Sequence, residues 1–414
     1  MTEARFLQIH TLHSYTSVLL NRDDSGLAKR LPYGGVMRTR ISSQCLKRHW
    51  RLADDPHALA RIAGATDAFR SRELVTRKVL GPLAGTVSQP TLDVLDELFQ
   101  ATVYGDKGTD KSKRQTLLFG KPELDWLAGQ AAMLAPKVEA AIMAAPEVAT
   151  AAPTESKGKR KGADTGKAQS KAAEAVTKEW KDTYAANIKA MREQTALPGG
   201  LASALFGRMV TSDPAANIDA PIHVAHAFTV HGEESESDYL TAMDDLKRDE
   251  DDSGADTIQE TEINSGLFYG YVVVDVPGLV ANTAGCDRKD WLTADRTLAA
   301  EVVHNLLYRI AEVTPGAKLG STAPYGRAEL VLVEAGDRQP RSLSPAFRTA
   351  AKPHLSDAMT RISQHLATMD RLYETGEKRR ALHLANEDLP GAPRGSMREI
   401  AAWAKAAVLS GAAS

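Results

Sequence analysis

Four segments rich in β-branched and aromatic residues are widely spaced along the chain, and their spacing constrains the fold more than any other feature. They are residues 4–13, 222–232, 266–276 and 327–336, and turn residues border them. Residues 266–276, "GLFYGYVVVDV", are the clearest, because Phe, Tyr and Val favour strands. We therefore expect four strands, two of them preceded by segments long enough to hold insertions.

Two helical patterns fill connections between these strands. The first follows Ser42 or Ser43, either of which is a good N-cap, and places Leu46 and Trp50 on one face. The second spans 292–313 and has apolar residues four positions apart, at Leu298, Val302, Leu306 and Ile310. The order β–α–β–β–α–β predicts an α+β fold of the ferredoxin-like type, with both helices behind a four-stranded antiparallel sheet. RNA-recognition (RRM) modules share this architecture.

The long connections differ in character. Residues 54–150 have helical patterns throughout, which predicts a helical insertion. Residues 151–178 are rich in Ala, Lys, Gly and Ser and bury too little apolar surface to order themselves, so we expect a mobile basic loop. Residues 233–264 are acidic and show no regular pattern. Two further helical stretches follow the last strand, at about 352–373 and 396–409.

The net charge of −2 over 414 residues conceals strong local patterning. Residues 22–51 carry eight basic residues against two acidic ones, and residues 153–181 carry eight against four. Residues 233–262 carry thirteen acidic residues against two basic ones. A basic block suits nucleic-acid phosphates, whereas an acidic block avoids them or docks on a basic block of another subunit.

The sequence "RTRISSQCLKRHWR", residues 38–51, combines five Lys or Arg with a helix start and contains no acidic residue. Lys47 and Arg51 are four residues apart, with Arg48 beside them, so the helix has a basic face next to an apolar one. Free N–H groups at a helix start, together with serine hydroxyls, form an anion site. Such contacts position a nucleic-acid strand without reading its bases. The plainer interpretation is a solvated basic helix face.

Several motifs resemble those of the backbone subunit of type I-E CRISPR Cascade, the CasC family of RAMP proteins. They occur in the family's order from about residue 5 to residue 335. The most specific are "LNRDD" (20–24) and "GG…R.RISSQ.LKR" (34–48). The supporting motifs are "LFGRM" (205–209), "VAHAFTVH" (224–231), "TAMDDL" (241–246), "SGLFYGY" (265–271) and "TPGAK" (314–318).

The resemblance implies a hand-shaped subunit that stacks in several copies along the spacer of a CRISPR RNA. Each thumb displaces one base at a regular interval, and the bases between are displayed for pairing with target DNA. The implied parts are an RRM-like palm (1–53, 196–232 and 265–345), helical fingers (54–195), an acidic thumb hairpin (233–264) and a C-terminal helical extension (346–414).

The resemblance also assigns roles to individual residues. The implied RNA-binding residues are Arg22, Arg40, Ser42, Ser43, Gln44, Lys47, Arg48, Arg51 and Met209. Met209 is implied to sit against bases near the kink, although core packing is its more ordinary role. The basic residues of the predicted loop that are candidates for target-DNA contact are Lys157, Lys159, Arg160 and Lys161. The implied partners are CRISPR RNA, target DNA, copies of the chain in a helical filament and other Cascade subunits, with no catalytic residue, cofactor or metal.

Two alternative functions remain open. Ferredoxin-like CRISPR endoribonucleases share the predicted fold, and His10 or His13, on opposite faces of the first strand, could cleave RNA by general acid–base catalysis. A sequence-specific single-strand binder would instead use aromatic residues on the sheet face. Tyr269 and Tyr271 are candidates for that role, or they pack beneath an insertion.

Metal chemistry and membrane insertion have little support. His223 and His226 are at an odd spacing, which on a strand places them on opposite faces, so with His231 they are interpreted as sheet histidines. Two cysteines, Cys45 and Cys286, cannot build a disulfide framework. The chain has no run of about 18 apolar residues and no secretory pattern at "MTEARFLQIH", so we expect a cytoplasmic protein.

Overall fold

The chain divides into two compact units. A computed structural model describes residues 2–105, 108–143, 165–242 and 257–413. Residues Met1–Gly64 and Pro221–Ser414 form one unit, here called the sheet unit. Residues Ala65–Ala220 form the other, here called the helical unit.

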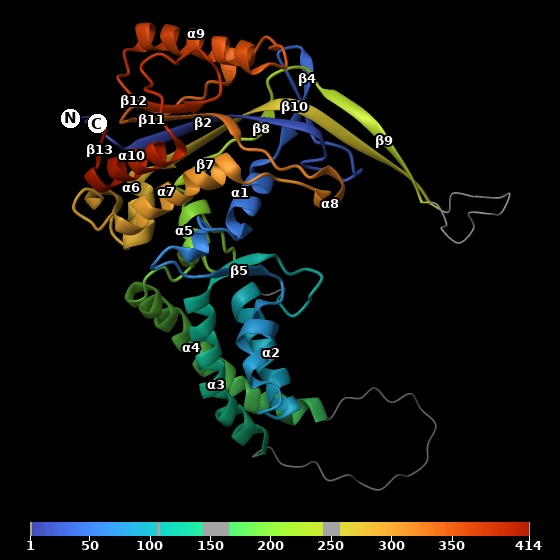
Figure 1. Cartoon of the computed structure of the whole chain (residues 1–414). Helices are drawn as coiled ribbons and strands as arrows, with labels where there is room; N and C mark the ends of the chain where they lie inside the picture. The colour runs from blue at the N-terminus through green and yellow to red at the C-terminus, as the bar shows by residue number, and fades with distance from the viewer. Residues whose placement is uncertain (1, 106–107, 144–164, 243–256, 414) are drawn as a thin grey trace, which may run out of the picture. The chain divides into compact units, whose positions relative to one another are not determined.

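The four predicted strands lie side by side in the sheet unit. They correspond to β2 (Phe6–Val18), β7 (Ile222–Val224) with β8 (Ala227–Thr229), β10 (Thr257–Asp275) and β11 (Ala328–Gly336). β11 pairs antiparallel with β2, β2 with β10, and β10 with β7 and β8. The last predicted strand therefore lies beside the first, and the third lies between the first and the second (Figure 1).

Further strands widen the sheet at both edges. β4 (Val36–Ile41) pairs with β8, and β3 (Arg30–Tyr33) pairs with β4. β12 (Lys378–His383) pairs with β11 at the other edge. The predicted helical C-terminal extension (346–414) is therefore wrong at β12, whose alternate residues Arg379, Ala381 and His383 are buried. The short strands β1 (Thr2–Glu3) and β13 (Ala412–Ala413) pair separately and bring the chain ends together.

One face of the sheet is covered by helices. They are α1 (Ser43–Leu52), α6 (Val276–Ala284), α7 (Thr297–Glu312) and α10 (Met397–Ser410), all on the same side in Figure 1. Trp50 of α1 and Leu306 of α7 are buried, as their apolar spacing predicts. α7 begins later than predicted, where Asp295 accepts a hydrogen bond from the amide of Thr297 (2.9 Å).

The opposite face is closed by residues 340–396 apart from the sheet strand β12, and the covering part includes α9 (Leu355–Tyr373). Tyr269 is 1% exposed, packs against Phe347, and its hydroxyl accepts the amide N–H of Leu343 (2.9 Å). RRM domains stack bases on the equivalent face. Because protein covers Tyr269 here, the sheet offers no open aromatic platform at this position, and the sequence-specific alternative loses one of its two candidate tyrosines.

The turn between β3 and β4 fits closely against residues 340–396. Gly34 has φ +64°, and a Cβ on it would collide with the carbonyl oxygen of Arg348. Gly35 has φ +84° but faces open space. We expect Gly34→Ala to lower the free energy of unfolding by about 2–4 kcal/mol, against about 1–2 kcal/mol of backbone strain for Gly35→Ala. Urea unfolding of both variants measures the difference, and equal losses would contradict a tight contact at Arg348.

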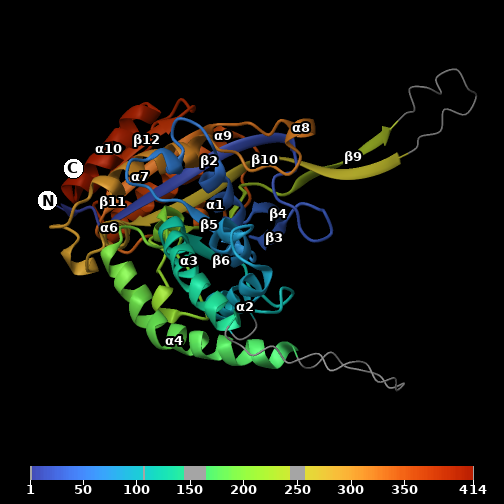
Figure 2. The same cartoon turned by 90° about the horizontal axis from the view of Figure 1, so that it is seen from below.

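A two-stranded ribbon projects from the sheet (Figures 1 and 2). β9 (Glu234–Ala242) pairs antiparallel with the first half of β10, from Ser265 opposite Glu234 outward. The predicted irregular course of 233–264 is therefore wrong over its described part, because β-favouring residues such as Tyr239 and Ile263 alternate with the acidic ones. Residues 243–256 lie outside the described ranges.

The helical unit is built from α2 (Gln89–Tyr104), α3 (Lys121–Met143), α4 (Thr165–Gln194) and α5 (Leu201–Phe206). The predicted helical course of 54–150 is right for α2 and α3. It is wrong at β5 (Ala68–Ser71) and β6 (Leu117–Gly120), which pair with each other. Between residues 54 and 88 only short helical turns occur, at Leu59–Arg61, Val75–Val79 and Gly81–Leu83.

The predicted mobile loop 151–178 is also wrong in part, because α4 begins at Thr165. Val176 and Trp180 of this helix are buried in the core of the helical unit. Ala, Glu and Lys are good helix formers, so the composition that suggested a loop also suits a helix with a buried side. The candidate DNA contacts Lys157, Lys159, Arg160 and Lys161 lie outside the described residues. Among the described helices, none combines the length and apolarity needed to span a bilayer.

Candidate nucleic-acid interface

The start of α1 is built as an anion site. Ser42 is the N-cap, and its hydroxyl accepts the amide N–H of Cys45 (3.3 Å). Its own amide N–H donates to the side-chain oxygen of Asn21 (2.8 Å). The first-turn amides of Ser43 and Gln44 then have no intrahelical acceptor. Together with the helix dipole, they favour a negatively charged group at this end.

An open groove runs past this helix start. Predicted RNA-binding residues that line it are Arg22, Ser42, Gln44 and Arg48. Residues that the sequence reasoning did not assign to RNA also line it: Leu20, Asn21, Asp23, Asp24, Gly26, Cys45, His49, Gly316 and Ala317. Gly316 and Ala317 belong to the "TPGAK" motif (314–318), and the amide N–H of Ala317 donates to the carbonyl of Leu19 (2.9 Å). The groove thus joins two of the quoted motifs to the helix start.

The loop that carries Arg22 is held in shape by its own hydrogen bonds. Arg22 forms an isolated β-bridge with Ala28. Asp23 Oδ1 accepts the amides of Ser25 (2.9 Å) and Leu27 (3.0 Å). Asp23 and Asp24 line the groove together with Arg22 and Arg48, so its formal charge is balanced. Phosphate binding here would depend on well-placed donors rather than on a large excess of positive charge.

Other predicted residues lie outside the groove lining. Lys47 and Arg51 are half-buried, and burial lowers the pKa of Lys47. Ser43 is buried, and its hydroxyl donates to Gln44 Oε1 (3.3 Å). Arg40 is half-buried, where it donates to the carbonyl of Arg30 (3.2 Å) and to His226 Nδ1 (3.0 Å). The role of these four residues in RNA binding stays a prediction from the sequence.

Arg38 has a structural role in the basic stretch. It is fully buried and donates to the backbone carbonyls of Tyr33 (3.2 Å), Thr229 (3.1 Å) and Phe347 (3.0 Å). It therefore joins the sheet to residues 340–396. The basic stretch divides into one buried arginine that holds the fold and a helix face that is exposed at Arg48.

Met209 lies in the helical unit and is 74% exposed. Its neighbours Arg208 and Val210 are both buried, and Arg208 forms an ion pair with the buried Glu123. Core packing, the more ordinary role considered for Met209, is therefore wrong. The chain displays this side chain on a well-anchored segment.

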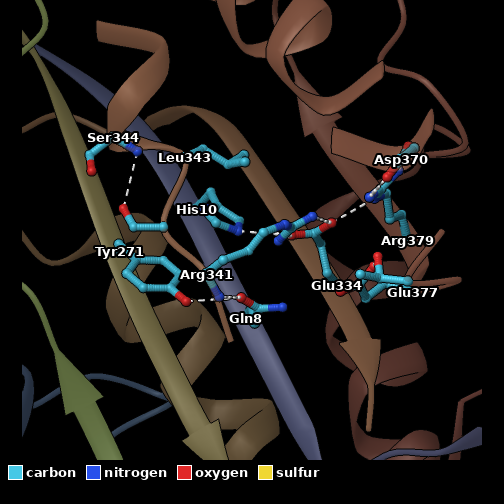
Figure 3. A network of polar contacts seen from close by, with 12 residues as sticks. Gln8, His10, Tyr271, Glu334, Arg341, Leu343, Ser344, Asp370, Glu377 and Arg379 are labelled. Atoms are coloured by element: carbon cyan, nitrogen blue, oxygen red, sulfur yellow. Dashed lines mark hydrogen bonds and ion pairs between the residues drawn. The ribbon is translucent and has the colours of Figure 1, made fainter. Parts of the chain in front are cut away.

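His10 lies inside a buried polar network on the covered face of the sheet (Figure 3). Its Nε2–H donates to Glu334 (3.0 Å), and its Nδ1 accepts from the Tyr269 hydroxyl (2.9 Å). Burial lowers the pKa of His10, although the hydrogen bond to Glu334 opposes this. Burial disfavours ionised Glu334, but hydrogen bonds from Arg341 and His10 outweigh it and hold the pKa of Glu334 well below its usual range.

His13 faces the helix-covered side of the sheet, as its spacing from His10 predicts. It lines a small cavity with Trp50 and Ile310. Burial lowers the pKa of His13 to about 4, and hydrogen bonds to the backbone carbonyls of Ala311 and Ile310 offset this only in part. Both histidines of the nuclease alternative are therefore neutral at pH 7 and packed within the sheet unit, away from the groove.

The low pKa of His13 makes stability depend on pH. The unfolded chain takes up this proton near pH 6.5, whereas the folded chain takes it up near pH 4, so stability falls as the pH falls between these values. The full shift corresponds to about 3 kcal/mol. We expect His13→Gln, which keeps a donor but does not titrate, to lose less stability than the parent between pH 7 and pH 4.5. Parallel pH–stability curves would contradict a half-buried His13 that is neutral at pH 7.

The histidine run begins in β7 with His223 and ends after β8 with His231. His231 is buried, accepts the amide N–H of Leu267 at Nε2 (3.0 Å) and donates from Nδ1 to the carbonyl of Gly232 (2.7 Å). The interpretation as sheet histidines is right for His223 of β7, and it is wrong for His226, which lies between β7 and β8, and for His231, which follows β8 and contacts β10 through its side chain. Across the described part of the chain, no group of three His, Cys, Asp or Glu side chains is arranged to hold a metal ion.

Comparisons with known proteins agree with this architecture. The profile of the family described as "CT1975-like protein" matches residues 7–404. A chain in a solved "CRISPR RNA-guided surveillance complex, pre-nicking" is 25% identical, with a TM-score of 0.72 over 97% of this chain and 100% of that one. A chain in a second "CRISPR RNA-guided surveillance complex" is 21% identical, with a TM-score of 0.54 over 97% and 99%, and shares the fold. A comparison with curated protein sequences finds no match.

Proposed function

The chain belongs to the CT1975-like protein family, and on this premise we propose that it is the CRISPR RNA-binding backbone subunit of a type I-E surveillance complex. Copies polymerise along the spacer of the RNA and present its bases for pairing with target DNA. The subunit binds and positions RNA and does not cleave it. The family match over residues 7–404 and the likeness to a surveillance-complex chain over 97% of the sequence support this proposal.

The observation that carries the proposal is the groove at the start of α1. It combines first-turn amides, the Ser42 cap and two exposed arginines, Arg22 and Arg48. First-turn amides at a helix start recognise phosphates and carry no sequence information, and arginine side chains also pair with phosphates. A subunit that must accept any spacer needs this kind of contact, because base pairing then reads the sequence.

The parts of the fold suit the hand-shaped arrangement. We assign the sheet unit to an RRM-like palm, the helical unit to the fingers, and the β9–β10 ribbon to the thumb. Three observations support this assignment: the adjacency of the four predicted strands, the helices on one sheet face, and the projecting ribbon. Residues 340–396 close the other sheet face, which favours the α1 groove as the RNA site.

The exposed Met209 is proposed to contact RNA bases. We expect Met209→Ala to change the free energy of unfolding by less than about 0.5 kcal/mol, because the side chain buries little surface. RNA affinity should nevertheless fall several-fold. Met133→Ala, at another exposed methionine of the helical unit (60% exposed), is the matched control and should bind RNA normally. Equal RNA affinities of the two variants would remove Met209 from the interface.

The wider set of partners follows from the same proposal. Neighbouring copies, other Cascade subunits and target DNA would contact surfaces beyond the groove. The role of Lys157, Lys159, Arg160 and Lys161 in DNA contact stays a prediction from the sequence. Deleting 157–161 without loss of DNA affinity in the assembled complex would refute it.

The proposal is tested with two labelled CRISPR-type RNAs of unrelated spacer sequence. Purified protein should bind both with equal affinity and leave both intact. Strong preference for one spacer would favour a sequence-specific binder. Cleavage by the parent chain that is lost in a His10→Ala or His13→Ala variant would instead establish the endoribonuclease alternative.

A further inference from the structure

Arg30, at the start of β3, joins the two strands at the base of the projecting ribbon. Its guanidinium forms ion pairs with Glu233, which directly precedes β9, and with Glu262 of β10. The three side chains are 29%, 16% and 9% exposed, respectively, so the cluster is largely shielded from water. Sequence reasoning missed this role, because Arg30 is only one of eight basic residues between positions 22 and 51.

The same cluster reaches the loop that lines the groove. The second carboxylate oxygen of Glu262 accepts the amide N–H of Ala28 (2.9 Å). Ala28 forms the β-bridge to Arg22, which lines the groove. A continuous series of polar contacts therefore runs from Arg22 through Ala28 and Glu262 to Arg30.

The other side of the ribbon is also attached near the groove. Thr261 and Glu262 are adjacent on β10, so their side chains point to opposite faces of the ribbon. The Thr261 hydroxyl accepts a hydrogen bond from Lys318 Nζ (2.6 Å). Lys318 follows Ala317, which lines the groove. Both faces of the ribbon base thus contact segments that shape the candidate RNA site.

We propose that Arg30 and Glu262 are positioning residues that couple the groove at α1 to the ribbon of β9 and β10. They hold the loop of Arg22 in its binding shape and fix the direction in which the ribbon leaves the sheet. This inference rests on the proposed RNA-binding function. It adds a mechanical link between the phosphate site and the ribbon, so that a strand seated in the groove meets a ribbon of defined orientation.

The coupling makes a prediction opposite to simple electrostatics. Glu262 is an acid close to a phosphate site, so removing its charge should, by charge alone, strengthen RNA binding. If its main effect is to order the Arg22 loop, removing the charge should weaken RNA binding. Glu262→Gln has nearly the same shape as the parent residue, so it isolates the charge-assisted contacts to Arg30 and Ala28.

The test measures RNA affinity of the assembled protein for Glu262→Gln, Arg30→Gln and their double variant. We expect each single variant to bind RNA about fivefold more weakly or worse, in the range of typical coupling effects. The double variant should lose little more than either single one, because both remove the same linkage. Glu236→Gln, at an exposed position of β9, makes the same charge change and should bind at least as tightly as the parent.

A second readout does not depend on RNA. Hydrogen exchange of the Ala28 amide should be faster in Glu262→Gln than in Glu236→Gln, because the acceptor of that amide is weakened. Unchanged exchange together with RNA affinity equal to or above that of Glu236→Gln would overturn the coupling. If Arg48→Ala weakens RNA binding and Glu262→Gln does not, the inference fails while the proposed function stands. If neither variant alters RNA binding, both fail.

Discussion

Replacing Arg22 and Arg48 together by alanine is expected to weaken RNA binding by about 10- to 100-fold at moderate salt. Both side chains are exposed and line the groove at the start of α1. Each lost contact to a single-stranded phosphate should remove about 0.7 from the log–log salt slope, so the double variant should lose about 1.4. Because phosphates carry no sequence information, RNAs of different spacer should lose affinity equally.

The matched control is a second double variant that removes two positive charges outside the groove. Arg338 and Arg371 are exposed and belong to other parts of the sheet unit. Replacing both by alanine should leave the affinity nearly unchanged. Titrations of each double variant at several salt concentrations give affinity and slope together. An equal loss in both double variants would mean that general charge, not the α1 groove, binds the RNA.

Glu334→Gln is expected to lower the free energy of unfolding by about 3–5 kcal/mol, because it leaves buried cations without their counter-charge. Glu334 is fully buried and receives hydrogen bonds from Arg341 (2.6 and 2.9 Å), Arg379 (2.6 Å) and His10 (3.0 Å). Arg379 also pairs with Asp370 of α9 (Figure 3). The network therefore attaches residues 340–396 to the sheet. Breaking these ion pairs should weaken the packing of residues 340–396 against the sheet face that they cover.

The appropriate comparison is an exposed ion pair with the same change in charge. Asp125→Asn breaks the pair with Lys121, and both side chains are more than half exposed, so the loss should be below about 1 kcal/mol. Urea unfolding of both variants, with RNA affinity as a second measurement, separates fold from function. Similar losses of stability would contradict the view that Glu334 is the central anion of a buried network.

The strands and crossover helices could be predicted because their signals are local. Phe, Tyr and Val mark β10, and apolar residues four apart mark α7. β12 could not be found this way, because Arg379 is buried by pairing with Glu334, which is 45 residues away in the chain. The start of α4 was missed because Ala and Lys suit both a loop and a helix, and only the burial of Trp180 decides.

The site could be predicted where a residue's role depends only on its neighbours in the sequence, as for a helix N-cap. Ser42 caps α1 as its position before the helix indicates, and Arg48 lies exposed on the helix. Contacts between residues far apart in the chain could not be predicted from the sequence. Asn21 supports Ser42 across 21 residues, and Arg30 pairs with Glu262 across 232. The exposure of Met209 was likewise invisible, because apolar residues are usually buried and only the neighbouring Arg208 and Val210 anchor the chain there.

The central claim, a subunit that polymerises along RNA, is tested most directly by the mass of its complexes on RNAs of increasing length. The account predicts that the number of protein copies per RNA rises in proportion to RNA length, while the RNA stays intact and its sequence is immaterial. A single copy per RNA at every length, or shortened RNA in the complexes, would contradict it.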